Sequence, residues 1–400
     1  MKRKILAEAK RAEQTTERSS KEPGSLRLKA SQKKKVSLKP GDFALTALVM
    51  LLVVFGVIMV FSASYYYAIS EKGTPYYYLI RDMLWAALGT VAMVTMAIFD
   101  YHRLQKMAFP IMGIVLVMLL LIFTPLGVTL NNATRWIGAG PVSIMPGEFA
   151  KPACILFVAA WLSNPKHPVR SITRGMLPLL FLAGVVAVLI AKQPSTTTAA
   201  TVVIIVFGMM FIAGMRLYYV AGAFGLGVGA LVFLILTDDT GYRMKRILSF
   251  RDPFADPQGT GYQVVQSLLA LGSGGLTGVG LGKSMQKTLY LPEPQNDFIL
   301  AIIGEELGFI GLLILLAVYL ILIWRCIHIA LNAPDIFGLL MASGITIMLG
   351  VQVVLNVMIV TSLMPPTGIS LPFVSWGGNS LLIFMGSMGV MLNISRHSAK

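Results

Sequence analysis

Long apolar runs, separated by short polar segments, are the main feature of the chain. A helix that spans a membrane needs about 20 predominantly apolar residues, and ten runs approach that length. They lie at residues 44–64, 79–99, 106–125, 148–163, 176–191, 198–215, 217–236, 298–324, 337–360 and 379–394. The pattern predicts an all-α polytopic integral membrane protein with ten transmembrane helices.

The composition supports this class of protein. Of the 400 residues, 56% are hydrophobic and 13% are charged, and the mean hydropathy is +0.75. Ordinary soluble domains contain about 25% charged residues and about 45–50% apolar residues. Soluble nucleotide-binding enzymes, disulfide scaffolds and disordered proteins are therefore excluded. Cys154 and Cys326 lie in or beside apolar runs and lack CxxC spacing, so they predict neither a disulfide nor a metal site.

The positive charge is concentrated at the N-terminus. Residues 1–40 carry thirteen Lys and Arg against four Glu, which is +9 of the net +15. We expect residues 1–42 to form a disordered, basic cytoplasmic tail that contacts anionic lipid or a partner, because positive residues remain inside during insertion. A nucleic-acid-binding arm is the less favoured interpretation. The first apolar run begins too late for a cleavable signal peptide.

The loop charges predict a topology. An even number of spans places both termini on one side, which the basic tail marks as cytoplasmic. Positive residues in the short loops agree with this side; they are His102, Arg103, Lys106, Lys166, Arg170, Arg174, Arg216, Arg325 and Arg396. We therefore divide the chain into the tail 1–42, a ten-helix membrane domain 43–395 and a cytoplasmic C-terminus 396–400.

Three loops are then external. Residues 237–297 form a large extracellular loop, in which 263–271 has a helical apolar pattern too short to span and predicts a re-entrant or interfacial helix. The loops 126–147 and 361–378 are smaller and rich in polar residues, Gly and Pro. Three structured loops on one side predict a single outward-facing site.

A glycine-rich stretch at 272–284 looks at first like a phosphate-binding loop. A Walker A motif requires Gly five positions before Gly282, where Thr277 stands, and no strand precedes it. We expect instead a tight external turn beside a helix end, whose backbone N–H groups could still meet an anion.

Acidic residues near the outer boundary are candidates for function, because charge inside a membrane is costly. Glu148 and Lys151 have the i, i+3 spacing of an ion pair on one helix face. Glu305 and Glu306 lie about two turns into the eighth span, and at least one should pair with Arg or Lys. Structural pairing and substrate contact both remain open for these residues.

Asp297 lies where the large loop meets the eighth span. A carboxylate there can accept a proton from a sugar hydroxyl as a general base, although a helix N-cap is the simpler interpretation. Basic residues of the same loop could neutralise a phosphate group; they are Arg243, Lys245, Arg246, Arg251, Lys283 and Lys287.

Six ordered motifs identify a family resemblance. They are NATRWI at 132–137, PGEFAK at 146–151, GYQ at 261–263 with GSGG at 272–275, LPEPQNDF at 291–298, GEELG at 304–308, and PPTG at 365–368 with LPFVSWGG at 371–378. Between about residues 43 and 393, the chain closely resembles the SEDS family (shape, elongation, division and sporulation), bacterial ten-span peptidoglycan glycosyltransferases of the FtsW, RodA and SpoVE type.

The resemblance implies roles for individual residues. Asp297 matches the essential aspartate of the large external loop, and Trp136 matches an important tryptophan after the third span. We expect substrate to be bound by Arg135, Trp136, Glu148, Lys151, Arg246, Lys283, Lys287, Glu306 and Ser375. Departures from the family pattern are Gly147 for Ser, Ser195 for a frequent Asp and Trp376 for Tyr.

The implied reaction is the polymerisation of lipid II into glycan strands outside the cytoplasmic membrane during septal wall synthesis. Asp297 would deprotonate the acceptor GlcNAc 4-hydroxyl, which attacks C1 of MurNAc with inversion and releases undecaprenyl diphosphate. Arg246, Lys283 or Lys287 would stabilise the leaving group. No cofactor is expected with certainty, and Mg²⁺ or another divalent cation is the candidate.

The resemblance also implies partners: lipid II, the undecaprenyl-linked nascent glycan, a class B penicillin-binding protein that crosslinks it, and other division proteins, but no nucleic acid. The basic tail favours a division role of the FtsW type. Two alternatives remain, a lipid II flippase or other transporter and a non-catalytic divisome scaffold. The clustering of charges at the outer edge, away from the midplane, favours the transferase.

Overall fold

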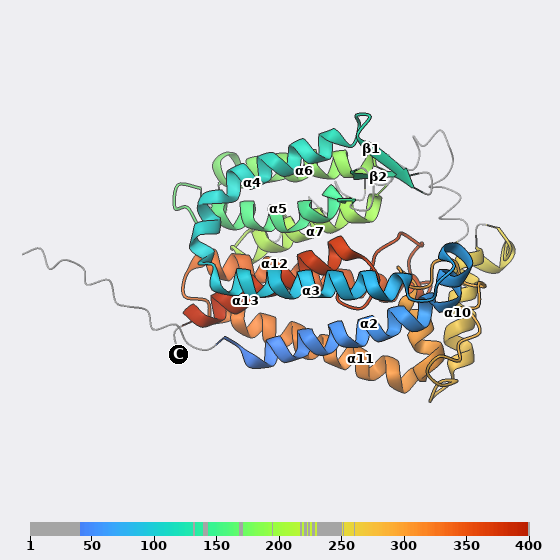
Figure 1. The fold of residues 1–400 in the computed structure, drawn as a ribbon. Helices are drawn as coiled ribbons and strands as arrows, with labels where there is room; N and C mark the ends of the chain where they lie inside the picture. The colour runs from blue at the N-terminus through green and yellow to red at the C-terminus, as the bar shows by residue number, and fades with distance from the viewer. Residues whose placement is uncertain are drawn as a thin grey trace, which may run out of the picture. The chain divides into compact units, whose positions relative to one another are not determined.

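The structure is a computed structural model, in which residues 41–130, 133–138, 143–167, 171–193, 195–216, 218–219, 222, 225, 229, 250, 252–259 and 261–398 are described. The regular elements of the described residues are helices apart from one short hairpin (Figure 1). The all-α prediction is thus confirmed for the membrane domain, while the hairpin was not predicted.

Long helices account for nearly all of the predicted spans. They are α2 (Phe43–Lys72), α3 (Tyr77–Ile98), α4 (Tyr101–Leu121), α5 (Pro146–Leu162), α6 (Leu177–Ala191) after the π-turn η1 (Ile172–Met176), α7 (Thr196–Ile212), α11 (Ile299–Leu331), α12 (Ile336–Val360) and α13 (Gly378–His397). Seven described helical segments are long and apolar enough to cross a membrane, and α7 is a shorter apolar helix. The predicted seventh span, 217–236, lies mostly outside the described residues.

The loops of functional interest gather at one end of the helices, here called the loop end. The hairpin of β1 (Gly127–Leu130) and β2 (Ala133–Ile137) lies there, as do the short η2 (Pro253–Ala255) and α10 (Tyr262–Gly274) (Figure 1). The predicted helix at 263–271 falls within α10. The opposite end holds the start of α2 and the end of α13, and is called the termini end.

The outward faces of the helices are apolar, as a bilayer requires. On α3, Ile80, Leu84, Leu88 and Val91 are all more than half exposed. A surface of this kind in water would be a large unpaired apolar patch. In a bilayer it contacts lipid, so this exposure supports a membrane-spanning bundle.

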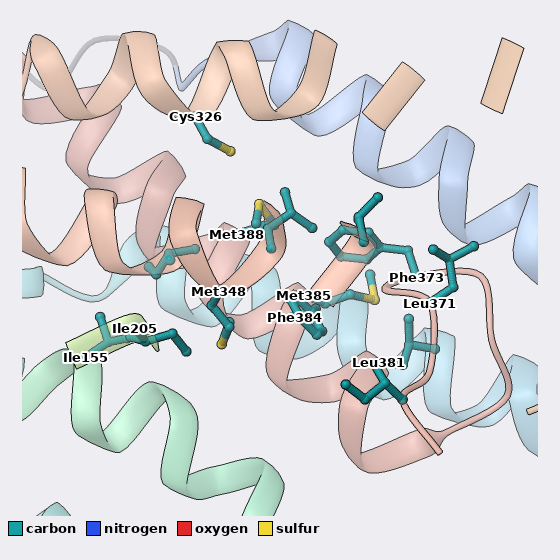
Figure 2. Packing of buried hydrophobic residues seen from close by; sticks show 14 of the residues in the cluster. Ile155, Ile205, Cys326, Met348, Leu371, Phe373, Leu381, Phe384, Met385 and Met388 are labelled. Atoms are coloured by element: carbon teal, nitrogen blue, oxygen red, sulfur yellow. The ribbon is translucent and has the colours of Figure 1, made fainter. Parts of the chain in front are cut away.

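The core is packed around α13. Met385 and Met388 of α13 lie beside Met348 of α12, and Phe373 packs against Phe384 (Figure 2). A Cβ on Gly378 would clash with Trp85 of α3. Small residues allow this close approach of helices, which dispersion forces stabilise in a membrane.

The termini end is closed by capping carboxylates. Asp42 accepts a hydrogen bond from Leu45 N at the start of α2. It also forms an ion pair with Arg325 at 2.6 Å. Asp335 caps α12 through Gly338 N at 2.8 Å and accepts the Tyr101 hydroxyl. The ion pair joins the start of α2 to the C-terminal part of α11, and the Tyr101 contact joins the starts of α4 and α12.

Candidate active site

Three segments meet around Gly368 at the loop end. The Gly368 backbone has a φ of +72°, which favours glycine. A Cβ at this position would lie 3.9 Å from both Arg135 Nη1 and Asp297 Oδ2. The structure therefore brings a predicted cation of β2 and the predicted base to the same side of one turn, although about 160 residues separate them in the sequence.

Asp297 lies two residues before Ile299, the first residue of α11. The N-cap position of this helix is Phe298, not Asp297. The simpler interpretation of Asp297 as the helix N-cap is therefore wrong. The Asp297 carboxylate therefore lies near the N-terminus of α11, beside the turn at Gly368.

The hairpin positions the two predicted residues of β2. Arg135 Nε donates to the carbonyl oxygen of Gln193 at 3.2 Å, which ties β2 to the segment before α7. Trp136 pairs with Val128 across the hairpin and is partly exposed. Nearby, the Ser195 hydroxyl donates to Thr198 Oγ1 at 2.8 Å, so the residue that replaces the family's frequent Asp bonds locally.

Glu148 and Lys151 form the predicted ion pair, at 2.7 Å. Both side chains are nearly buried, and Lys151 Nζ also donates to Gln352 Oε1 at 2.9 Å. Glu148 lies in the first turn of α5, where the helix dipole favours an anion. The pairing is thus confirmed, and its contact with substrate stays a prediction.

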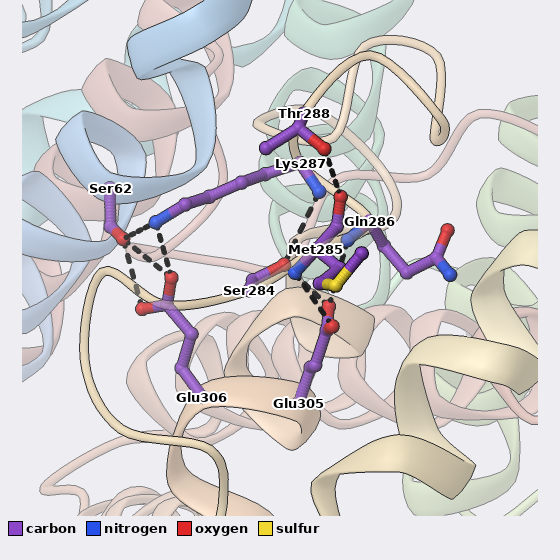
Figure 3. A network of polar contacts seen from close by, with 8 residues as sticks. All are labelled: Ser62, Ser284, Met285, Gln286, Lys287, Thr288, Glu305 and Glu306. Carbon is purple, nitrogen blue, oxygen red and sulfur yellow. Dashed lines mark hydrogen bonds and ion pairs between the residues drawn. The ribbon is translucent and has the colours of Figure 1, made fainter.

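A second buried pair joins Lys287 to Glu306 at 2.7 Å (Figure 3). Ser62 of α2 donates to Glu306 and accepts from Lys287 Nζ at 3.0 Å. The expectation that one of the two glutamates pairs with a cation is confirmed. Since Glu306 neutralises Lys287 inside the protein, the geometry supports a structural role for this pair, and a role in substrate binding stays a prediction.

Glu305 organises the loop that carries Lys287. Its carboxylate accepts the Ser284 hydroxyl and the backbone N–H of Met285 at 2.9 Å and of Gln286 at 3.3 Å (Figure 3). A carboxylate with several donors is well compensated for its burial. Two adjacent glutamates thus hold one loop, Glu305 through residues 284–286 and Glu306 through Lys287.

The glycine-rich stretch packs against a break in α11. Gly308 has a φ of +69°, and the carbonyls of Glu305 and Glu306 accept Val279 N and Gly280 N, both at 3.0 Å. A Cβ on Gly278 would clash with the Glu306 carbonyl. The expected turn is present, and the N–H groups of Val279 and Gly280 bond to α11, so these two are not available to an anion.

The remaining predicted residues lie apart or outside the described residues. Arg246 is outside them, as are Arg243, Lys245 and Arg251. Lys283 is exposed on the glycine-rich loop, and the Ser375 hydroxyl accepts Leu371 N at 2.7 Å. Their contact with substrate stays a prediction.

The described residues of the site form no cage of protein ligands for a metal. Among the described residues, no group of three or more His, Cys, Asp or Glu side chains gathers closely enough to hold an ion. Mg²⁺ often uses only one or two carboxylates together with substrate phosphates. A divalent cation at this site stays a prediction.

A pocket of about 390 Å³ lies elsewhere at the loop end, between α2 and the glycine-rich loop. Its lining residues are Ile58, Phe61, Ser62, Tyr65, Tyr66, Leu281, Gly282 and Lys287. None of them belongs to the segments that meet at Gly368. The pocket is therefore distinct from the turn at Gly368, and the predicted site residue Lys287 lines it.

Three buried polar residues of the spans were not predicted from the sequence: Asp82, Gln352 and Asn356. Asn356 Nδ2 donates to the carbonyls of Asp297 and Ile369, and Gln352 Nε2 donates to that of Ser370. The available signal was a polar side chain inside an apolar run, which is costly and often functional.

These features define a multi-span helical membrane protein with a polar site at the loop end. The sequence matches the FtsW/RodA/SpoVE family, described as "cell cycle protein", over residues 43–400, and the chain belongs to this family. The SEDS resemblance read from the motifs is thereby confirmed. The chain is accordingly a multi-pass protein of the cytoplasmic membrane.

Similar proteins cover nearly the whole chain. Stage V sporulation protein E of Bacillus subtilis is 41% identical over 358 residues, which is 89% of this chain and 97% of that protein. The probable peptidoglycan glycosyltransferase FtsW of Geobacter sp. (strain M18) is 38% identical over 355 residues, 88% of this chain and 96% of that protein.

Solved structures support the fold. A chain of a peptidoglycan synthase complex, studied for its coordination of polymerization and crosslinking, has a TM-score of 0.74 at 28% identity, covering 90% of this chain and 99% of that one. The crystal structure of the rod shape determining protein RodA of Thermus thermophilus has a TM-score of 0.65 at 27% identity, covering 90% and 98%.

Proposed function

We propose that the protein is a peptidoglycan glycosyltransferase that polymerises lipid II into glycan strands. The observation that carries this proposal is the meeting of Arg135 and Asp297 at Gly368, 3.9 Å from one shared point. A base and a cation at one place suit a reaction that removes a proton and releases an anionic diphosphate. The names of the similar proteins agree with this chemistry.

In the proposed reaction, Asp297 takes the proton of the acceptor GlcNAc 4-hydroxyl. The oxygen forms a bond to C1 of MurNAc on the lipid-linked donor, and configuration at C1 inverts. The bond from C1 to the phosphate oxygen breaks, and undecaprenyl diphosphate leaves with the electron pair. The guanidinium of Arg135 would stabilise the developing negative charge.

The proposal includes an orientation and a partner. The loop end faces the outside of the cytoplasmic membrane, and both chain termini are cytoplasmic, because the basic tail 1–42 carries much of the positive charge. The similar chain in a synthase complex that coordinates polymerization and crosslinking supports a class B penicillin-binding protein as partner.

The test is polymerisation by the purified protein, with and without its cognate transpeptidase, when supplied with lipid II. Asp297→Asn should lower polymer formation by about 100-fold or more, since a general base contributes about that much. Glu293→Gln neutralises a carboxylate in the same segment and should leave polymerisation near the wild-type level. Thermal melting checks that both variants are folded.

The other outcomes separate the alternatives. Full activity of Asp297→Asn would support the transferase assignment but show that Asp297 is not its general base. An absence of polymer from the wild type with its partner would instead favour the lipid II flippase or the divisome scaffold.

A septal role of the FtsW type is the finer part of the proposal. The basic tail 1–42 supports it, as a segment that cytoplasmic division proteins can bind. A fluorescent fusion in the native bacterium should mark division sites in growing cells. Signal confined to sporulating cells would contradict the septal role and favour the sporulation type.

A further inference from the structure

One side chain of α12 connects the two backbone segments of the candidate site. Asn356 is fully buried, and its Nδ2 donates to the carbonyl of Asp297 at 2.8 Å and to the carbonyl of Ile369 at 2.7 Å. An amide nitrogen has two hydrogens, so each carbonyl receives one. The two segments are thereby held at a fixed separation.

These two carbonyls flank the groups that meet at Gly368. Asp297 carries the carboxylate. Ile369 follows Gly368, where an added Cβ would lie near that carboxylate and Arg135. Asp297 precedes α11, and its carbonyl accepts a hydrogen bond from α12 through Asn356.

Gln352, one turn earlier on α12, extends the same arrangement. Its Nε2 donates to the Ser370 carbonyl at 3.2 Å, while its Oε1 accepts Lys151 Nζ at 2.9 Å. Lys151 is in turn paired with Glu148. A buried row of polar groups therefore runs from α5 through α12 to residues 369–370.

We propose that Asn356 is a positioning residue for the Asp297 carboxylate, supported by Gln352 and Lys151. The inference rests on the proposed role of Asp297 as general base. Without the amide, the buried Ile369 carbonyl and the partly buried Asp297 carbonyl lose their donor, and the Asp297 segment shifts relative to the Gly368 turn. A displacement of about 1 Å can cost an enzyme about 100-fold in rate.

The test uses the full-length protein with its transpeptidase and compares lipid II polymerisation by three variants. Asn356→Leu removes both donors at similar volume and should lower kcat about 10- to 100-fold with little change in KM. Asn356→Ser is smaller, retains one donor and should lie between this variant and wild type. Thr346→Val removes only a bond within α12 and should leave kcat unchanged.

A second measurement separates positioning from general damage. In the Asp297→Asn background, Asn356→Leu should lower the residual rate by less than about threefold, because a lost base cannot be further misplaced. The same fold-loss in both backgrounds, or full activity of Asn356→Leu, would overturn the positioning role. Full activity of Asp297→Asn would instead overturn the proposed base. If Asn356→Leu does not fold, Asn356→Ser is compared in the same two backgrounds.

Discussion

Charged residues at the two ends of the bundle are used in different ways. At the loop end, Lys287 and Glu306 are paired with side chains only 3% and 0% exposed. At the termini end, His102 bridges Asp100 and Asp335, with exposed fractions of 49%, 46% and 33%. The first kind of pair is enclosed by protein, whereas the second remains in contact with solvent.

The difference in burial shows which charged pairs hold the fold in one arrangement. A buried pair costs desolvation, and removal of one partner leaves a stranded charge. An exposed pair contributes little, because water and salt screen it. The loop end accepts the larger cost where its charged groups hold the loops around the candidate site, and the termini end uses carboxylates mainly as helix caps.

The largest expected effect is at the buried pair of the loop end. Lys287→Met leaves the Glu306 carboxylate buried without its cation, which should destabilise the fold by about 3–5 kcal/mol. Thermal unfolding in detergent measures the loss. The double variant Lys287→Met, Glu306→Gln should recover most of it, and a single variant as stable as the wild type would contradict the contrast between the two ends.

A smaller effect is expected at the termini end. Asp335→Ala removes the cap on Gly338 N and the acceptor of the Tyr101 hydroxyl, which should cost about 1–2 kcal/mol. Asp335→Asn keeps a capping oxygen and should lose less. The same unfolding measurement ranks the two variants, and a loss equal to that of Lys287→Met would remove the distinction between the two ends.

The smallest effect concerns pH at the same end. Partial burial raises the pKa of the Asp100 carboxyl, but hydrogen bonds from His102 outweigh it, and the pKa falls below its ordinary value of 3.8. The ionised form is therefore favoured by folding, and this contribution is complete above that value and lost as pH falls through the lowered pKa. Asp100→Asn should reduce the acid-induced fall in melting temperature slightly, and an identical fall in both proteins would contradict this.

The sequence predicted what depends on near neighbours. Apolar runs of the length of a membrane indicated the spans, and the i, i+3 spacing indicated the pair of Glu148 and Lys151. The partner of Glu306 could not be named, because Lys287 reaches it only after the glycine-rich loop has folded against α11.

For the candidate site, the sequence predicted the residues but not the contacts that bring them together. Motifs singled out Asp297 and Arg135, but the turn at Gly368 that brings them together depends on contacts across the bundle. Asn356 was missed because an isolated amide within an apolar helix has no periodic pattern. Its partners are backbone carbonyls, which any sequence supplies.

The break at Gly308 has a consequence for engineering the loop end. Phe309 N and Ile310 N donate to the carbonyls of Gly275 and Leu276, while the carbonyls of Glu305 and Glu306 accept Val279 N and Gly280 N. Residues 275–280 thus supply the hydrogen-bond partners that backbone groups of α11 lack at the break. An epitope tag or reporter inserted among these residues would displace these hydrogen bonds from their partners on α11.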